Sequence, residues 1–214
     1  MHSGKAPRVL ITGGPTRAYL DRVRFLSNVS TGALAHALAR QLKARGVKVA
    51  AVVGPTCHDF RGLGLTHFVS VETNRQMETE VLRLCRAFRP DFAVFSAAVL
   101  DFEPVSVRPG KRSSRSGWTV RLRPTPKIID RVGRRFPGIR RIGFKLEWAS
   151  GRTDWTAWAS RRMREQGLEA LCLNFLSEIE GKRHPARLFS RDGKSAQAPT
   201  KEAIARWITR RVSS

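Results

Sequence analysis

Short apolar runs alternate with helical patterns in the first half of the chain. Residues 8–12 are an apolar run followed by Gly13 and Gly14, as in a buried strand that ends in a turn. Residues 31–46 then carry apolar positions at the 3.6-residue period of a helix, and residues 47–55 are apolar on both faces, as parallel strands are. These patterns predict a strand–helix–strand unit.

A second helix and a third strand continue this alternation. Thr73 is expected to cap a helix whose apolar positions recur as far as Phe88, and Pro90 follows its end. Residues 91–99 are another apolar run. Alternation of this kind predicts right-handed βαβ units around a parallel sheet.

The second half of the chain begins with an irregular stretch, 101–118, rich in Pro, Arg, Ser and Gly. Its length is typical of a lid or a binding loop. Further elements are expected beyond it, with strands at 118–123, 139–146, 168–174 and 185–193 and helices at 126–136, 156–167 and 200–212. The sequence has no internal repeat and no linker, so we expect one α/β domain over residues 1–214. Its fold should be Rossmann-like and doubly wound, with a mostly parallel sheet.

No apolar run in the sequence approaches the roughly 18–20 residues that a membrane span requires. The first residues pass almost directly into the strand pattern, without the apolar stretch and cleavage site of a signal peptide. These observations predict a cytoplasmic protein with no membrane partner.

The cysteines and histidines show no metal-ligand spacing. Cys57, Cys85 and Cys172 lie far apart in the sequence and are expected to be small buried hydrophobic residues. The five histidines form no HExxH motif and no paired cluster in the sequence, so a structural zinc site is not expected.

The chain is strongly basic, with 40 lysine and arginine residues against 17 acidic ones and a net charge of +23. Such a charge suits an anionic partner, which could be nucleic acid, a membrane surface or a phosphate-bearing substrate. The basic residues are scattered, however, and no basic tail is present. We therefore favour a bias in composition toward arginine on solvated faces over binding of nucleic acid. A non-catalytic nucleotide-binding or nucleic-acid-binding module stays open as the alternative.

Two segments have the features of an anion site at a helix N-terminus, where backbone amides are unpaired and the helix dipole is positive. One contains Gly13 and Gly14, and the other contains Ser30, Thr31 and Gly32 just before the first helix. Both should lie beyond the carboxyl ends of the strands, where open α/β sheets bind ligands. Ser30 and Thr31 fit the role of simple helix caps equally well.

A nicotinamide-dependent oxidoreductase is disfavoured by two missing motifs. The GxGxxG fingerprint is absent, because Gly13-Gly14 leads to Arg17 instead of a third glycine. The single tyrosine, Tyr19, is followed four residues later by Val23, so the Tyr-xxx-Lys pair of short-chain dehydrogenases is absent as well.

A series of short motifs runs in order along the chain. The first is the string ITGGPTRAYLDRVRFLSNVSTG at 11–32, with its Gly-Gly-Pro-Thr, Asp-x-Val-Arg and Asn-x-Ser-Thr-Gly elements. The later ones are VVGP (52–55), AAVLDF (97–102), KRSS (111–114), TPKII (125–129), IGFKL (142–146) and TKE (200–202). Together they resemble the phosphopantothenate–cysteine ligase family, from residue 8 to about residue 212. The Gly-Phe-Lys-Leu form resembles the stand-alone bacterial type.

This resemblance implies a homodimeric ligase of coenzyme A biosynthesis. In the family, the carboxylate of 4′-phosphopantothenate attacks the α-phosphate of a nucleoside triphosphate, usually CTP in bacteria, with ATP as the alternative. Pyrophosphate leaves, and the amine of L-cysteine then attacks the acyl-nucleotide to form an amide. Mg²⁺ and fixed positive charge are expected to screen the two anions of the first step. A separate flavin-dependent decarboxylase is left open as a partner.

The resemblance also implies roles for individual residues. Lys111 matches the lysine of acyl-nucleotide formation, and Asn28 matches the asparagine of the second half-reaction. The expected nucleotide-binding positions are Gly13, Gly14, Ala97, Asp101, Gly143, Phe144 and Arg162, with Asp101 also able to serve the metal ion. The expected phosphate-binding positions are Ser30, Thr31 and Gly32. Arg24 is expected either to take part in the site or only to pair with Asp21.

Several positions depart from the family pattern. The family's Ser-Ser-Gly-Lys-Met-Gly is Ser-Thr-Gly-Ala-Leu-Ala at 30–35, which loses a lysine and a glycine. Two lysines that serve the triphosphate in the family are Arg162 and Gln166 here. Arginine can hold a phosphate, but glutamine supplies no charge. Nucleotide choice and triphosphate affinity are therefore left open.

Overall fold

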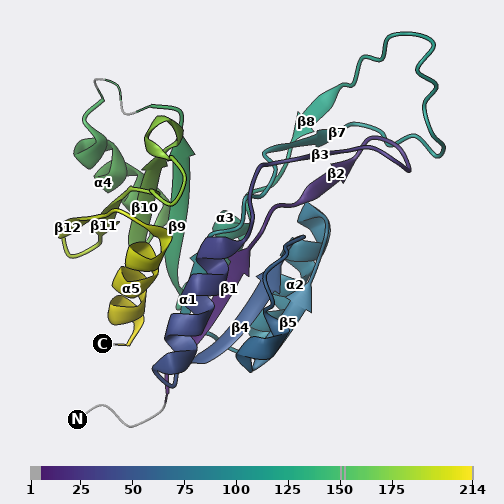
Figure 1. The fold of residues 1–214 in the computed structure, drawn as a ribbon. Coiled ribbons are helices and arrows are strands. Elements are labelled where there is room, and N and C mark those ends of the chain that lie inside the picture. Colours follow the sequence, from purple (N-terminus) through teal and green to yellow (C-terminus); the bar gives the residue numbers. More distant parts are fainter. Residues whose placement is uncertain (1–5, 150, 152, 214) are drawn as a thin grey trace.

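The computed structural model describes residues 6–149, 151 and 153–213. An eight-stranded sheet forms the body, and an arm of two small hairpins extends away from it (Figure 1). In sheet order the strands are β12 (Ser195–Ala198), β11 (Ala186–Ser190), β10 (Ala170–Phe175), β9 (Arg140–Glu147), β6 (Phe92–Phe95), β1 (Arg8–Gly13), β4 (Lys48–Val53) and β5 (His67–Ser70). The pairs β10–β11 and β11–β12 are antiparallel and the other pairs in this sheet are parallel, so the predicted mostly parallel α/β domain is confirmed.

The six parallel strands follow the order of a doubly wound fold. Numbered along the chain, they lie third, second, first, fourth, fifth and sixth across the sheet. The direction of winding therefore reverses between β1 and β6. Ligands of open α/β sheets bind at such a switch point, beyond the carboxyl ends of the strands.

Helices cover both faces of the sheet. They are α1 (Ala33–Ala44), α2 (Asn74–Ala87), α3 (Ile128–Arg135), α4 (Trp155–Gln166) and α5 (Lys201–Val212). Alternate residues of a strand point to opposite faces. Val9 and Ile11 of β1 accordingly share a core with Leu38 of α1, whereas Leu10 packs with Met77 of α2. The buried residues place α1 and α5 on one face and α2, α3 and α4 on the other.

Local sequence signals account for most helix boundaries. The hydroxyl of Thr73 accepts from the amide of Gln76, whose side chain in turn accepts from the amide of Thr73. Thr200 caps α5 as expected. The first helix differs from its prediction, because it begins at Ala33 with Gly32 as the N-cap at φ 76°. The hydroxyl of Thr31 accepts from the amide of Ala33 at 3.3 Å. Neither Ser30 nor Thr31 is the N-cap residue, but Thr31 bonds the first amide of the helix as a capping side chain does.

The arm and most of the shortest elements were not expected from the sequence. They are β2 (Arg17–Tyr19), β3 (Phe25–Ser27), β7 (Phe102–Pro104), and the 3₁₀ helices η1 (Arg61–Leu63) and η2 (Leu176–Glu178), besides β5 and β12 of the main sheet. The strand expected at 118–123 is shorter and begins later, as β8 (Leu122–Pro124). β2 pairs with β3, and β7 pairs with β8. The segment 105–121, between β7 and β8, forms the far end of the arm (Figure 1).

The cysteines match their prediction in part. Cys85 and Cys172 are buried, and burial raises the pKa of both thiols, that of Cys85 to about 12. Cys57 is exposed, because it lies in the loop after β4, so its predicted burial is wrong.

The histidines do form one pair in space. The rings of His36 and His58 stack, with 5.2 Å between their centroids. Within the described ranges, no three His, Cys, Asp or Glu side chains gather as a metal site. No helix among the described residues is both long and apolar enough to cross a bilayer.

Candidate functional site

The segments that follow β1 and β6 lie side by side at the switch point. The amide of Ala98 donates to the carbonyl of Gly14 at 2.9 Å, and the amide of Thr16 donates to the carbonyl of Ala98 at 3.4 Å. Gly14 has φ 70°, and a Cβ there would lie 2.9 Å from the carbonyl oxygen of Gly54. Both facts require glycine, so the turn after β1 depends on this residue.

Asn28 reaches this junction from the end of β3. Its Nδ2 donates to the carbonyls of Ala98 at 3.3 Å and Val99 at 3.1 Å. The hydroxyl of Ser27 donates to the carbonyl of Thr16 at 2.9 Å, which fixes the base of the hairpin against the turn. The carboxamide is therefore held directly over the carboxyl end of β6.

Asp101 lies two residues beyond the carbonyl that Asn28 contacts. Its backbone carbonyl accepts from the amide of Thr125 at 2.9 Å, and its carboxylate forms an ion pair with Lys127. The structure thus brings Asn28 and Asp101 to one edge of the sheet. Lys127 was missed as a candidate site residue, although it lies in the TPKII motif, and its charge beside Asp101 makes it one.

The two segments predicted as anion sites adjoin each other. A Cβ built on Gly32 would lie 3.5 Å from the amide nitrogen of Gly14 and 3.0 Å from the hydroxyl of Thr56. That hydroxyl donates to the carbonyl of Thr31 at 2.7 Å. Gly32, directly before α1, therefore faces the turn after β1, and Ser30 lies two residues ahead of it in the same segment.

Three residues expected around the nucleotide lie at two neighbouring strands, just past β6 and on β9. The amide of Ala97 donates to the hydroxyl of Thr12 at 3.3 Å, just past β6. Gly143 is buried on the neighbouring strand β9, and a Cβ there would meet a methyl group of Leu168 at 3.1 Å. Phe144 is half-buried and packs against the core on the opposite face.

Arg162 and Gln166, the two positions on α4 where the family has lysines, differ in their surroundings. Arg162 is half-buried on α4. Gln166 donates from Nε2 to the carboxylate of Asp130 at 2.8 Å, so it ties α4 to α3.

Lys111 lies on the arm, apart from Asn28 and Asp101 of the same chain. The next residue, Arg112, donates its amide to the carboxylate of Asp21 at 3.0 Å, at the turn of the β2–β3 hairpin. Asn28 follows the other end of that hairpin. Four residues of extended strand separate Asn28 from Arg24 at the turn, which is roughly 13 Å. The structure therefore does not bring Lys111 to the other two residues within one chain.

Asp21 fastens the lysine-bearing loop to the hairpin. Its side chain is 1% exposed and accepts from the amides of Val23, Arg24 and Arg112. These bonds, that of Arg112 first, lower the pKa of Asp21 to about 2, against the opposing effect of desolvation. Arg24 pairs with this carboxylate at 2.9 Å and donates to the carbonyl of Arg112 at 3.2 Å. Of the two roles left open for Arg24, the structure contains the pairing with Asp21.

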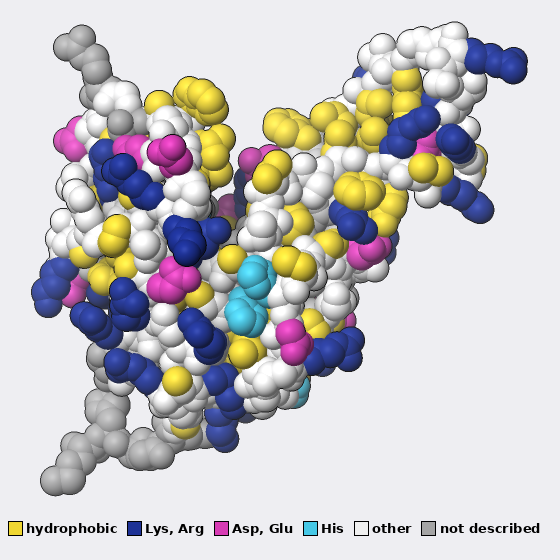
Figure 2. Space-filling view, viewed as in Figure 1, with side chains coloured by type: hydrophobic (Ala, Val, Ile, Leu, Met, Phe, Trp, Pro, Cys, Tyr) yellow, Lys and Arg dark blue, Asp and Glu magenta, His cyan; other side chains and the backbone are white. Residues whose placement is uncertain are grey.

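The arm carries an apolar surface (Figure 2). Its members, each more than 40% exposed, are Val23, Phe25, Phe102, Val105, Val107 and Leu122. Contiguous exposed apolar surface of this kind marks an interaction site.

Comparison with known proteins identifies relatives over nearly the whole chain. The family model of the DNA/pantothenate metabolism flavoprotein C-terminal domain matches residues 4–214. The coenzyme A biosynthesis bifunctional protein CoaBC of Thermococcus kodakarensis is 30% identical over 200 residues, which are 92% of this chain and 49% of that one. The CoaBC protein of Bacillus subtilis is 32% identical over 167 residues, with 78% and 39% covered. The chain spans about half the length of these curated relatives, or less.

Solved structures share the fold. The C-terminal domain of a CoaBC protein is 26% identical with a TM-score of 0.77, over 98% of this chain and 95% of that one. The DNA/pantothenate metabolism flavoprotein from Streptococcus pneumoniae is 23% identical with a TM-score of 0.82, covering 97% and 98%. A Cab2 mutant in complex with phosphopantothenate-cysteine is 18% identical with a TM-score of 0.70, covering 96% and 86%.

Proposed function

Because the chain belongs to the family of the DNA/pantothenate metabolism flavoprotein C-terminal domain, we propose that it joins 4′-phosphopantothenate to L-cysteine through an acyl-nucleotide. This domain is the phosphopantothenate–cysteine ligase part of CoaBC proteins. The stand-alone bacterial type, suggested by the Gly-Phe-Lys-Leu motif, stays a prediction, because the matched curated relatives named above are bifunctional.

In the first half-reaction, the carboxylate of 4′-phosphopantothenate attacks the α-phosphate of the triphosphate, and pyrophosphate leaves. Both reactants are anions, so fixed positive charge must lie where they meet. The amides at the start of α1 and the turn at Gly13-Gly14 suit the substrate phosphate and the nucleotide phosphates. Lys127 adds a cation at the mouth of the site. Lys127 thus supplies positive charge. Gln166 supplies none, because it is uncharged and its side chain is hydrogen-bonded to Asp130.

Asp101 fits a role toward Mg²⁺. Its side chain is exposed beside the switch point, and a single carboxylate suits this ion, which keeps several waters and binds substrate phosphates. Bound there, the ion would offset negative charge on the phosphates. The partner of Asp101 in this structure, Lys127, would then be free to approach a phosphate itself.

In the second half-reaction, the amine of cysteine attacks the acyl carbonyl and the nucleoside monophosphate leaves. Asn28 is suited to stabilise the developing oxyanion, because a carboxamide donates a hydrogen bond without acting as a competing base. Its Nδ2 now donates to two backbone carbonyls. Exchanging one of these bonds for the acyl oxygen would keep the group in place.

Lys111 is assigned to the active site of a second copy of the chain. Asp21 and Arg24 fasten its loop to the far end of the hairpin through hydrogen bonds to Arg112. The loop cannot bring Lys111 to Asn28 of the same chain without breaking these hydrogen bonds. The apolar surface of the arm suits an isologous homodimer interface. An arm that crosses to its partner would then deliver Lys111 in trans.

The observation that carries the proposal is the meeting of Asn28 with the Ala98–Val99 backbone, directly before Asp101, at the switch point. A coupled pyrophosphate assay with CTP and ATP compared side by side tests it. Pyrophosphate should be released only when both a triphosphate and 4′-phosphopantothenate are present, and cysteine should yield the amide. Absence of release with either nucleotide would exclude the ligase.

A basic nucleic-acid-binding module is the alternative that the net charge of +23 favours. Lysine and arginine side chains are spread over the visible face among acidic ones, without a continuous stripe (Figure 2). Such a module would bind any nucleic acid with a steep salt dependence and would release no pyrophosphate.

A further inference from the structure

Thr16 ends the turn after β1, and the reaction proposed above does not use it. It is fully buried. Its amide donates to the carbonyl of Ala98, and its carbonyl accepts from the hydroxyl of Ser27, the residue before Asn28. The backbone of Thr16 alone thereby joins two segments of the candidate site. Its side chain also needs partners, because buried hydroxyl groups are hydrogen-bonded.

The hydroxyl of Thr16 belongs to a closed ring of three hydrogen bonds. It donates to Oδ1 of Asn74, the first residue of α2, and Nδ2 of Asn74 donates to the carbonyl of Leu100 at 2.7 Å. The amide of Leu100 closes the ring by donating to the Thr16 hydroxyl at 3.1 Å. Each of the three residues both donates and accepts, so the loss of one member leaves polar groups of the other two unpaired.

This ring fixes the peptide that precedes Asp101. The carbonyl of Leu100 also accepts from the hydroxyl of Thr125, and the carbonyl of Asp101 accepts from the amide of Thr125. A peptide unit is planar, so bonds to the Leu100 carbonyl also fix the plane that contains the Asp101 nitrogen. The side chain of Asp101, by contrast, is exposed. A held backbone with an exposed carboxylate is suited to present that carboxylate to a ligand.

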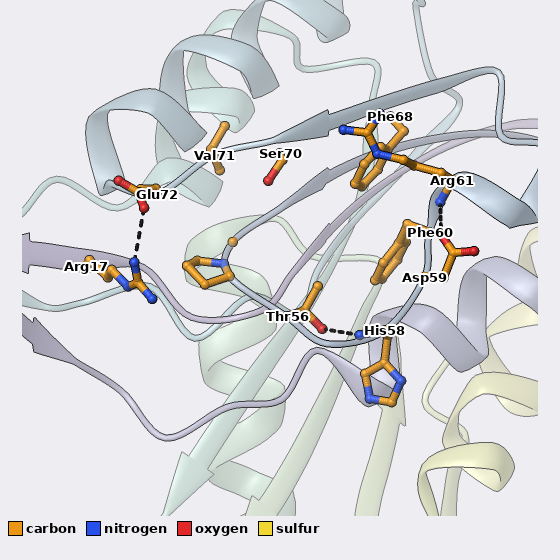
Figure 3. A pocket seen from close by; sticks show the side chains of 12 residues that line it. Arg17, Thr56, His58, Asp59, Phe60, Arg61, Phe68, Ser70, Val71 and Glu72 are labelled. Atoms are coloured by element: carbon orange, nitrogen blue, oxygen red, sulfur yellow. Dashed lines mark hydrogen bonds and ion pairs between the residues drawn. The ribbon is translucent and has the colours of Figure 1, made fainter.

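The residue after Thr16 is anchored to the segment before α2. The amide of Arg17 donates to the carbonyl of Glu72 at 2.7 Å. The guanidinium of Arg17 pairs with the carboxylate of Glu72 at 3.0 Å, at one side of a hollow of about 380 Å³ (Figure 3). Thr16 is therefore held opposite the start of α2, and the ring joins this helix to the segments that follow β1 and β6.

We propose that Thr16 is a positioning residue, which holds Asp101 in register with Asn28 at the switch point. Its hydroxyl acts on Asp101 through the Leu100 peptide, and its carbonyl acts on Asn28 through Ser27. One buried residue thereby sets where the carboxylate assigned to the nucleotide and its cation lies relative to the carboxamide assigned to the acyl carbonyl. This role of Thr16 rests on the proposed function, since both assignments belong to it.

Calorimetric titration of the full chain with Mg²⁺-CTP and with Mg²⁺-ATP tests the role without turnover. Thr16→Val keeps the shape of the side chain and removes its hydroxyl, which leaves the amide of Leu100 unpaired. We expect the Kd of each triphosphate that the wild type binds to rise about fivefold or more. Thr16→Ser, which keeps the hydroxyl, should bind as the wild type does.

A matched control separates positioning from loss of a buried hydroxyl in general. Thr209 of α5 is buried too, and its hydroxyl donates to the carbonyl of Ala205 at 2.8 Å. Thr209→Val should leave the Kd unchanged. Thermal melts check that each variant is folded.

Two further variants keep the test decisive if Thr16→Val folds poorly. Asn74→Ala opens the same ring from a half-buried position and should raise the Kd by a similar factor. In an Asp101→Asn background, Asn74→Ala and Thr16→Val should have no further effect on the Kd, because their effect passes through Asp101.

An unchanged Kd in both Thr16→Val and Asn74→Ala would overturn the positioning role, and so would an equal rise in the presence and absence of the Asp101 carboxylate. A wild type that binds a triphosphate but releases no pyrophosphate would contradict the ligase alone. A wild type that binds neither triphosphate would contradict both.

Discussion

Single residues at the switch point divide the proposed chemistry between two half-reactions. Asn28 is held by backbone carbonyls that follow β6, where the carbonyl of an acyl-nucleotide would become tetrahedral. Lys111 is exposed and lies next to a residue that Asp21 anchors, so its charge can be presented at the end of a fixed loop. Substitution of Lys111 should therefore block the first half-reaction, and substitution of Asn28 should block the second.

Lys111→Gln should lower pyrophosphate release by about 100-fold or more, because the cation that offsets charge in the first step is lost. Asn28→Asp should still release pyrophosphate but accumulate the acyl-nucleotide, which mass spectrometry detects. Lys194→Gln, at an exposed lysine between β11 and β12 that pairs with Asp192, is a control for loss of a lysine outside the site. Undiminished pyrophosphate release in Lys111→Gln would remove that residue from the mechanism.

His184 gives the fold a pH dependence away from the active site. Burial, and secondarily the charge of Lys201, lower its pKa from 6.5 to about 4 in the folded chain. The unfolded chain therefore binds a proton between pH 6.5 and 4 that the folded chain does not, so stability is lost as the pH falls through that window. At pH 5 the loss should be on the order of 1 kcal/mol.

Replacing His184 by Gln should remove this loss. Between pH 7 and pH 5 the Tm of the variant should fall by about 2–4 °C less than that of the wild type. His67→Gln, at an exposed histidine of β5, should keep the wild-type slope. Parallel pH profiles for wild type and His184→Gln would contradict the assignment.

Elements with strong local signals were predicted from the sequence, and elements fixed by long-range contacts were not. The cap at Thr73 and the apolar period through Phe88 predicted α2 correctly, because both act within one helix. The three-residue strands Arg17–Tyr19 and Phe25–Ser27 have no periodicity to detect, since pairing with each other defines them. β5 was missed for a similar reason, as its four residues become a strand only beside β4.

The turns at the ends of β1 and β4 pack so closely that a glycine is required at Gly54. A Cβ there would lie 1.7 Å from the carbonyl oxygen of Pro15, which the turn cannot accommodate without moving. Gly54→Ala should therefore cost about 3 kcal/mol and lower the Tm by about 6–12 °C. Gly110→Ala, on the arm with open space around its Cβ, should leave the Tm unchanged, and equal melting of both variants would contradict the packing argument.

At the scale of the whole molecule, the sequence predicted that Asn28 and Asp101 lie together, but it did not predict where Lys111 lies. Asn28 and Asp101 could be placed together because both follow segments at the carboxyl edge of one parallel sheet. Lys111 could not be placed, because nothing local in the stretch at 101–118 shows that Arg112 bonds to Asp21 or that the stretch forms the end of an arm. The arm separates the lysine from the body of its own chain and offers it, with an apolar surface, to a second copy.

Trans delivery of Lys111 predicts that two inactive variants restore each other. In a dimer of Lys111→Gln with Asn28→Asp, one site combines the intact Asn28 of the first chain with the intact Lys111 of the second, while the other site has both defects. Half of randomly mixed dimers are of this kind, so co-expression should restore about a quarter of the wild-type rate of amide formation. If Lys111 acted within its own chain, every site would retain a defect, and the co-expressed mixture would form amide no faster than the separate variants.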